Sequence, residues 1–331
     1  MSGSVVYPSA VHDPSTGAID RLPGSIRRTS HIDMVPHGTT WDGLDIHASA
    51  RDLRTAGGGA AIVATARLDA ELGPRRVLQT LRTEPSLPAL QELVGMPVAR
   101  GFRKALGEVV ADELASQTPL ALLVDDLPIA VLISGYADSY VWEHTPVDVS
   151  STRADICAGW VHDGTMLTLT AETGYLPQPV GPEAPSLERE DDPLAWHDVP
   201  VLTDGAMRRR RLIDVRRHAA GRDGFGVHAM FRDTYQRDGV ERILHEYALA
   251  AQVADGVFSA CTATPRVLPW PECPSAAASA TRIVGEPVRT ARELVRANFR
   301  GTSTCTHLND LLCTLADVAA LIAALSSDGD D

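Results

Sequence analysis

The chain has 331 residues, 44% of them hydrophobic, which is enough to bury one large core or two modest ones. Its formal net charge of −13 argues against nucleic acid or an anionic membrane as a partner, because both require basic surface. Neither a signal peptide nor an apolar run of membrane-spanning length is evident, which predicts a cytoplasmic protein whose five cysteines are thiols or ligands rather than disulfides.

Composition and motif spacing divide the chain into five parts. Residues 1–22 are rich in Ser, Pro and Gly and predict a flexible N-terminus, and a first folded unit follows over 23–134. A connector over 135–205 has a later part rich in Pro, Glu and Asp, which predicts a loop. A second folded unit spans 206–325, and the chain ends in an acidic tail, 326–331.

The two folded units share a series of motifs in fixed order. Asp-Gly, His-Ala and Arg-Asp pairs surround His47 in the first unit and His228 in the second, at a constant offset (228 − 47 = 181). Later matches, such as Gly95 with Gly285, are 190 residues apart. Matches assigned to this larger offset include Arg76-Val77-Leu78 with Arg266-Val267-Leu268. The pattern predicts two tandem copies that pack together as a pseudo-dimer.

The second unit is predicted to contain four strands followed by three helices. Alternation of apolar and polar residues, which is typical of strands, occurs over 211–215, 227–235, 244–253 and 257–267. After Pro269 an Ala-rich helix ends before Gly285, a second helix follows Pro287, and an amphipathic helix begins near Thr306. Each copy is therefore expected to be an α+β unit, with helices on one face of a four-stranded antiparallel sheet.

The second unit carries four residues with the donor atoms of a metal site: His245, Cys273, Cys305 and His307. Imidazole and thiolate are the usual ligands of zinc and iron. Cys305 is expected at the N-terminus of a helix, where the dipole favours a thiolate. None of the four has a counterpart in the aligned segments of the first unit, so we interpret that unit as a degenerate copy.

Three residues are candidates for acid–base catalysis beside the metal: Glu246, His307 and His228. Glu246 follows a ligand and is the candidate general base, although alternation along a strand would point it away from that ligand. His307 could serve as the fourth ligand or as the acid, oriented by Asp310 three residues later. His228 is equally consistent with an ordinary hydrogen-bonded histidine in a strand.

Other conspicuous residues have a simpler structural interpretation. Cys261 and Cys313 are expected in the core, because cysteine is among the most buried residue types. The pairs Arg51-Asp52 and Arg232-Asp233 occur in both units and are interpreted as structural pairs or turn-formers. The four arginines over 208–211 are expected to open an edge strand, and binding of an anionic substrate is the alternative.

Five motifs of the second unit are shared with one known family: Ile213-Asp214, His245-Glu246, Pro271-Glu272-Cys273, Ile283-Val284-Gly285 and Cys305-Thr306-His307-Leu308. On these motifs, residues 208–325 resemble an uncharacterised bacterial family, the domain of unknown function 2889. The resemblance implies no function. Typical members are single-copy, so the chain resembles a fused tandem version.

A more distant likeness involves the order of sheet and helices. Cys273 with the Ser- and Ala-rich segment after it, Val284-Gly285, and Cys305 before the last helix are similar to features of the U-type iron–sulfur cluster scaffold proteins. That resemblance implies a metal site formed by His245, Cys273 and Cys305, with His307 as a candidate fourth ligand. The first cysteine of those scaffolds falls near Ile243, which cannot bind a metal.

These features predict a metal-dependent enzyme of the lyase, cyclase or hydrolase type that acts on a small acyl, carboxylate or aromatic substrate. Zinc or iron would polarise a carbonyl or activate water at an open coordination position. Within the connector, residues 166–170 could form a strand, and Trp160, His162 and Asp163 are expected to fold over the site as a lid.

Two alternatives remain open. The first is a non-catalytic iron–sulfur or zinc binding or carrier module, and the second is a structural or regulatory partner without metal. The expected partners are a small-molecule substrate, the other copy within the chain and a second chain in a homodimer. Nucleic acid and membranes are not expected.

Overall fold

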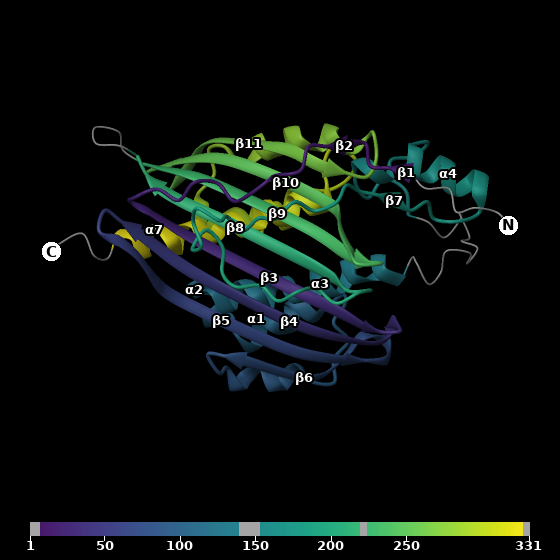
Figure 1. Ribbon diagram of the computed structural model, residues 1–331, viewed down its shortest axis with the longest axis horizontal. Coiled ribbons are helices and arrows are strands. Elements are labelled where there is room, and N and C mark those ends of the chain that lie inside the picture. Colours follow the sequence, from purple (N-terminus) through teal and green to yellow (C-terminus); the bar gives the residue numbers. More distant parts are fainter. Residues whose placement is uncertain (1–6, 139–152, 219–223, 327–331) are drawn as a thin grey trace.

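The computed structural model describes residues 7–138, 153–218 and 224–326. The first six residues, the connector segment 139–152 and the acidic tail from 327 lie outside the described residues. The fold is a mixed α+β arrangement built on one antiparallel sheet of nine strands, in the order β2-β11-β10-β9-β8-β3-β4-β5-β6. The green strands β9–β11 form one half of the sheet, the blue strands β4–β6 form the other, and β8 and β3 meet in the middle (Figure 1).

Each folded unit supplies four long strands to this sheet. The first unit supplies β3 (Ser25–His37), β4 (Thr39–Ala56), β5 (Gly59–Gly73) and β6 (Val77–Glu84). The second supplies β8 (Met207–Arg217), β9 (Phe225–Arg237), β10 (Val240–Ala254) and β11 (Val257–Leu268). The short strand β2 (Val11–His12) extends the edge beside β11, and β1 (Tyr7–Pro8) pairs with β7 (Pro179–Val180). The four strands predicted for the second unit are confirmed.

Most helices follow the strands of their unit, and η1 lies between β5 and β6. In the first unit they are η1 (Pro74–Arg76), η2 (Pro88–Leu93), α1 (Phe102–Val109), α2 (Ala111–Ser116) and α3 (Pro119–Asp138). In the second they are η5 (Cys273–Ile283), η6 (Val288–Thr290), α5 (Ala291–Asn298), α6 (Thr306–Thr314), η7 (Leu315–Asp317) and α7 (Val318–Ser326). The connector adds η4 (Ala158–Trp160) and α4 (Thr165–Thr173). The face of the sheet that packs against α3, α6 and α7 is called the helix face below.

Residues 166–170 form part of helix α4, so the expected strand is wrong. Gly174 at the C-cap adopts a left-handed conformation that ends the helix, and its N–H donates to the Thr170 carbonyl. The Thr170 hydroxyl donates to the carbonyl of Met166, which satisfies that polar group inside the helix. Alternating threonines in this segment resemble a strand pattern, but a helix lets Met166 and Thr170 share one buried face.

Two helices are long and apolar enough to cross a membrane by length and composition, which the sequence argument missed. They cover Pro119–Tyr136 in α3 and Thr306–Ser326 in α6 to α7. In the structure, 67% and 61% of these windows are buried within the protein. Both segments pack against strands of the helix face, where they bury their apolar residues in the two main cores.

The arginine run 208–211 lies in the middle of the sheet, so its assignment to an edge strand is wrong. β8 pairs with β9 on one side and with β3 on the other. Arg208 is bonded to Asp33 at 2.6 Å, and Arg211 to Asp126 at 2.5 Å. Carboxylates from neighbouring strands and helices neutralise these buried arginines, which is the condition for placing charge inside a protein.

Residues 181–204 of the connector cross the other face of the sheet and are called the strap below. Leu187, Ala195 and Trp196 of the strap form a small core with Leu212 and Met230 of the sheet. Arginines of the sheet fasten the strap by donating to its carbonyl groups, at Pro185, Leu194, Ala195 and Pro200. The later connector is therefore irregular, as predicted, and it is an integral part of the fold.

The N-terminal segment also lies against this face, although its composition suggested a flexible chain. Ala18 is buried with the strap core, and Ser15 donates its backbone N–H to Glu246 at 2.8 Å. β2 completes the arrangement at the edge of the sheet. Residues 7–22 are thus bound to the second unit through backbone and side-chain contacts.

Two buried histidines join the strap to the sheet. The His31 Nδ1 and His197 Nε2 atoms are 2.7 Å apart, and the other ring nitrogen of His197 is 2.7 Å from the Thr29 hydroxyl. Burial, together with the charges of Arg208 and Arg210, lowers the pKa of His31 to about 3, and burial lowers that of His197 to about 2. Both rings are therefore neutral at neutral pH.

This pair predicts a loss of stability in acid. The unfolded chain protonates histidine near the usual pKa of 6.5, and the folded state resists protonation until about pH 3. The free energy of unfolding contributed by the pair should be complete above about pH 7 and should decline as the pH falls from about 6.5 toward 3. Urea unfolding of the native chain and of His197→Asn across this range would measure it. An advantage of the native chain that does not shrink on acidification would contradict the assignment.

Candidate functional site

A β-bulge in β10 directs two consecutive side chains toward the helix face. Ile243 pairs with Thr234 and His245 pairs with Asp233, so Leu244 is left without a partner in the β9–β10 ladder. Leu244 and His245 both line the same cavity as a result. Bulges commonly re-aim side chains beside functional sites.

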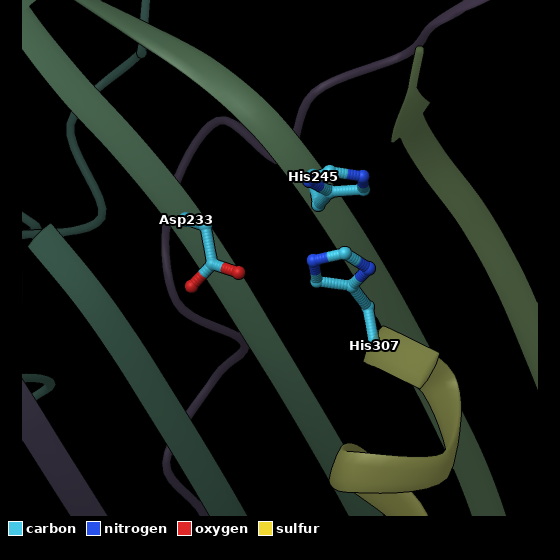
Figure 2. Close-up of side chains that lie close together, drawn as sticks. All are labelled: Asp233, His245 and His307. Atoms are coloured by element: carbon cyan, nitrogen blue, oxygen red, sulfur yellow. The ribbon is translucent and has the colours of Figure 1, made fainter. Parts of the chain in front are cut away.

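Helix α6 brings a second histidine over the first. His307 lies in the first turn of α6, and its ring stacks on that of His245, with 3.6 Å between ring centroids and 14° between planes. Figure 2 shows Asp233 on the neighbouring strand β9 with its carboxylate directed toward the two rings. One ligand atom from each of the three residues lies within 4.8 Å of the others. The structure thus gathers two imidazoles and one carboxylate from three elements.

Arg209 orients the carboxylate of this cluster. Its Nε donates to one oxygen of Asp233 at 2.7 Å, and its Nη2 donates to the other at 2.8 Å. Its remaining terminal nitrogen donates to Asp310 at 2.5 Å, and Asp310 also accepts from Arg211. Asp310 was expected to orient His307, but the structure pairs it with the two arginines instead.

The two histidines are uncharged in this environment. Burial, together with the positive charges of Arg209 and Arg211, lowers the pKa of His307 to about 3. Burial, followed by the proximity of the His307 imidazole, holds the pKa of His245 well below 6.5. Neutral imidazole is the form that binds a metal ion or accepts a proton.

A cavity of about 290 Å³ opens above the cluster. Its polar floor consists of residues from the second unit: Arg209, Asp233, His245, Thr306, His307 and Asp310. One apolar wall comes from helix α3, which supplies Ile129, Leu132, Ile133 and Tyr136. Met207 and Leu244 complete the apolar lining. The first unit, interpreted from its sequence as degenerate, therefore builds part of the cavity.

The predicted ligands Cys273 and Cys305 lie outside this cluster. Among the described residues, the set of three donors within reach of one ion contains both predicted histidines but neither cysteine. The cysteines are buried with Cys157 and Tyr247, and a Cβ added at Gly159 would lie 2.7 Å from the Cys273 sulfur. The four predicted ligands thus divide between two places.

The thiols of this second group are protonated. Burial raises the pKa of Cys305 to about 11 and also raises the pKa of Cys273 and Cys157. Cys305 does precede α6, as predicted, but burial outweighs the stabilising effect of the helix N-terminus on a thiolate. Cys261 and Cys313 are buried in the core, as expected.

A thiol assay should therefore find the native protein unreactive. Because the thiolate is the reactive species and all five cysteines are buried, we expect almost no reaction with Ellman's reagent at pH 8 in the folded state. Five thiols should react after unfolding in denaturant. Rapid modification of one or more thiols in the folded protein would show that the buried group is accessible.

The other two predicted catalytic residues point to the strap face. Glu246 accepts from the Arg232 Nε at 2.7 Å and is fully buried, so it faces away from His245, as alternation along a strand requires. His228 lies on the same face, where burial lowers its pKa to about 4. Neither residue lines the cavity.

The three connector residues expected to form a lid do not cover the cavity either. His162 and Asp163 are exposed, with the His162 Nδ1 3.1 Å from an Asp163 carboxylate oxygen, and Trp160 packs against the core that contains the cysteines. None of the three lines the cavity, so the expected lid is not found in the described connector.

Asp233 and Arg209 are the site residues that the sequence argument missed. Asp233 was set aside because both units contain an Arg-Asp pair, and Asp52 of the first unit is indeed held by Arg28 in the same way. The distinguishing signal is the residue opposite on the next strand, which is His245 for Asp233 and Ala64 for Asp52. That difference becomes visible only when the strand register is known.

Comparison with known proteins gives one match. No curated protein and no solved structure matches the chain. The model of a family described as "Protein of unknown function (DUF2889)" matches residues 207–321, which run from the start of β8 into α7. The tandem arrangement and the likeness to iron–sulfur scaffolds stay predictions. Residues 207–321, which hold both histidines and the aspartate of the cluster, therefore match the model of this uncharacterised family.

Proposed function

We propose that the protein is a metal-dependent enzyme whose zinc or iron ion is held by Asp233, His245 and His307 above the cavity floor. The observation that carries the proposal is the approach of these three donors to within 4.8 Å of one another beside a cavity of about 290 Å³. This set replaces the mixed histidine–cysteine set expected from the sequence. Lyase, cyclase and hydrolase chemistry stay within the proposal.

The donor set suits a catalytic ion. Two histidines and one carboxylate leave coordination positions open for water or substrate, as in catalytic zinc sites and non-haem iron sites. Arg209 uses one hydrogen bond per Asp233 oxygen, so each oxygen keeps a lone pair for an ion. Metal–ligand bonds of about 2.0–2.2 Å require the donors to approach more closely than the 4.8 Å limit, so we expect the stacked rings to pivot on binding.

A metal ion at this position would face the cavity. It could polarise a carbonyl or lower the pKa of a bound water molecule, and the enclosed setting would strengthen either effect. The Thr306 hydroxyl lines the same floor and can donate or accept a hydrogen bond near the ion. A small molecule that enters along α3 would reach the open coordination positions directly.

We also propose that the two folded units are tandem copies that pack as a pseudo-dimer. In the β3–β8 ladder, Ser30 pairs with Arg211, the residue 181 positions later, so this pair lies at the centre of a two-fold arrangement. The ion pairs on either side of it are reciprocal: Arg27 binds Asp214, and Arg208 binds Asp33.

The ladders favour two changes to the proposed alignment of the copies. The bulge at His245 recurs at Ala64, so the offset of 181 extends through β5 and β10. The backbone of Leu78 donates a hydrogen bond to residue 96 and accepts one from residue 95. The backbone of Phe258 makes the same two bonds with residues 286 and 285, so Leu78 corresponds to Phe258 and not to Leu268. The extra residues of the second unit therefore fall after this point, in the longer β11 and the turn that follows it.

A cytoplasmic location remains part of the proposal. All five cysteines are free and buried, which suits a reducing compartment, where thiols persist. The proposed partner is a small molecule bound in the cavity.

A cobalt titration tests the metal site. We expect the chelator-treated protein to bind about one Co²⁺ per chain, with visible absorption bands of a nitrogen- and oxygen-bound ion and without the intense thiolate charge-transfer band. His307→Ala should weaken binding by about 100-fold or more. His228→Ala, a buried histidine on the other face, and Cys273→Ser should leave binding unchanged. Failure to bind metal, or a thiolate band that Cys273→Ser removes, would refute the proposed site.

A further inference from the structure

The one cation that lines the cavity, Arg209, is paired with two carboxylates. The Nε and Nη2 atoms of Arg209 donate hydrogen bonds to Asp233, and its remaining terminal nitrogen donates one to Asp310. Recognition of a carboxylate or phosphate group usually requires the fork of donors that an unpaired arginine offers. Among the residues that line this cavity, no unpaired cation is present to receive such a group.

The charges behind the floor also disfavour an anion. Asp310 and Asp126 share Arg211, so the carboxylates Asp126, Asp233 and Asp310 outnumber the two arginines Arg209 and Arg211 by one. Arg103 approaches Asp310 only at 3.9 Å and from the partly exposed side. An anionic ligand that enters the cavity would lose its hydration without gaining a charged partner from the protein.

The upper part of the cavity is apolar. Ile129, Leu132, Ile133 and Tyr136 follow one face of α3 at helical spacing, and they stand over the polar floor. Leu132 is 66% exposed, which places it at the opening. The lining therefore offers a substrate an apolar surround for its body and polar groups at one end only.

The volume fits a compact molecule. A dry cavity of about 150 Å³ holds benzene, so 290 Å³ accommodates a single ring with a short substituent. The imidazoles of His245 and His307 line the floor and can exchange hydrogen bonds with a carbonyl or hydroxyl group there. A longer or charged substituent would have to project past Leu132 into solvent.

We infer that the substrate is a small neutral molecule, with a monocyclic aromatic or equally compact apolar body and one carbonyl or hydroxyl group directed at His245 and His307. This inference deepens the proposed function and rests on it. Of the acyl, carboxylate and aromatic classes expected from the sequence, the protein lining favours the uncharged aromatic or acyl compounds, because a free carboxylate would find its one charged partner in the proposed metal ion. The selection comes from Arg209, whose charge the protein has already neutralised.

Matched probes test the inference in metal-free protein. Acetophenone and benzamide are neutral, and benzoate has a similar shape with a negative charge. Calorimetry on the chelator-treated chain should show that the neutral probes bind at least 10-fold more tightly than benzoate. Leu132→Trp should narrow the opening and weaken the neutral probes by about 10-fold or more. Val201→Trp, at a position that is 96% exposed and does not line the cavity, is the matched control.

A second variant reverses the selection. Asp310→Asn removes one of the two carboxylates that occupy Arg209, so we expect the ratio of benzoate to acetophenone affinity to rise at least 10-fold. Because this buried substitution could impair folding, the Leu132→Trp result carries the test alone if the variant is unstable.

The outcomes separate the two proposals. Three results would overturn the proposed substrate class and leave the cobalt result standing. They are benzoate binding as tight as that of acetophenone, no binding of any probe, and binding of the neutral probes that Leu132→Trp does not weaken. Selective binding of the neutral probes without any metal binding would instead support the class and overturn the metal-dependent function.

Discussion

Replacement of Arg209 by methionine should lower the free energy of unfolding by about 3–5 kcal/mol, because it leaves buried carboxylates without their partner. Arg209 lies on the central strand β8 and is 1% exposed, and it binds Asp233 and Asp310 through three hydrogen bonds. Methionine fills much of the same volume, so the loss reports the uncompensated charge rather than a cavity. Urea denaturation monitored by far-UV circular dichroism would measure it.

Two further variants make the result specific. Arg237→Met, at the solvent-exposed end of β9, should change stability by about 0.5 kcal/mol or less. The double variant Arg209→Met/Asp233→Leu should recover part of the loss, because it removes the stranded carboxylate as well as the arginine. A single variant as stable as the Arg237→Met control would show that the ion pairs of Arg209 with Asp233 and Asp310 do not stabilise the fold.

The periodicity of the sequence was sufficient to predict the strands, because each strand of the second unit alternates between a packed and a polar face. Val227, Ala229 and Phe231 face the helices, and His228 and Met230 face the strap, as the alternation required. The strand order was not predictable from this pattern. Alternation of apolar and polar residues indicates which face of a strand is buried, but it does not indicate which strands are its neighbours in the sheet.

The arginine run shows why composition misled the placement of β8. Four consecutive arginines are typical of an exposed edge, and their neutralising partners are distant in sequence: Asp33 is 175 residues from Arg208, and Asp126 is 85 residues from Arg211. No local window contains both members of these pairs. Burial of a charge depends on partners that only the folded topology supplies.

The candidate site was half predictable for a similar reason. His245 and His307 were selected by donor type alone, and they do meet. Cys305 is only two residues from His307, yet it belongs to a different buried group beside Tyr247, because adjacent residues at a helix start point in different directions. Asp233 lies opposite His245 because a bulge adds one residue to β10, and no sequence pattern predicted that bulge.

Substitution of Gly181 by alanine should lower the free energy of unfolding as much as any other single substitution in the strap. A Cβ at this position would lie 1.6 Å from the carbonyl oxygen and 2.8 Å from the carbonyl carbon of Ile243, so backbone must move. Ile243 is fixed to the strap by the bond from its N–H to the Pro182 carbonyl at 2.9 Å, and the bulge at Leu244 begins with the next residue. We expect a loss of about 3 kcal/mol in the free energy of unfolding.

The same substitution tests whether the strap positions the histidine cluster. Displacement of Ile243 would shift His245 two residues later, so Gly181→Ala should also weaken Co²⁺ binding under conditions in which the variant remains folded. Gly107→Ala in α1 has no neighbour within 4 Å of the added Cβ and should be neutral or slightly stabilising, by up to about 1 kcal/mol. If Gly181→Ala loses stability but binds Co²⁺ as the native chain does, the strap supports the sheet without setting the geometry of the bulge. If both fall together, the strap on one face and the cluster on the other are coupled through the backbone of β10.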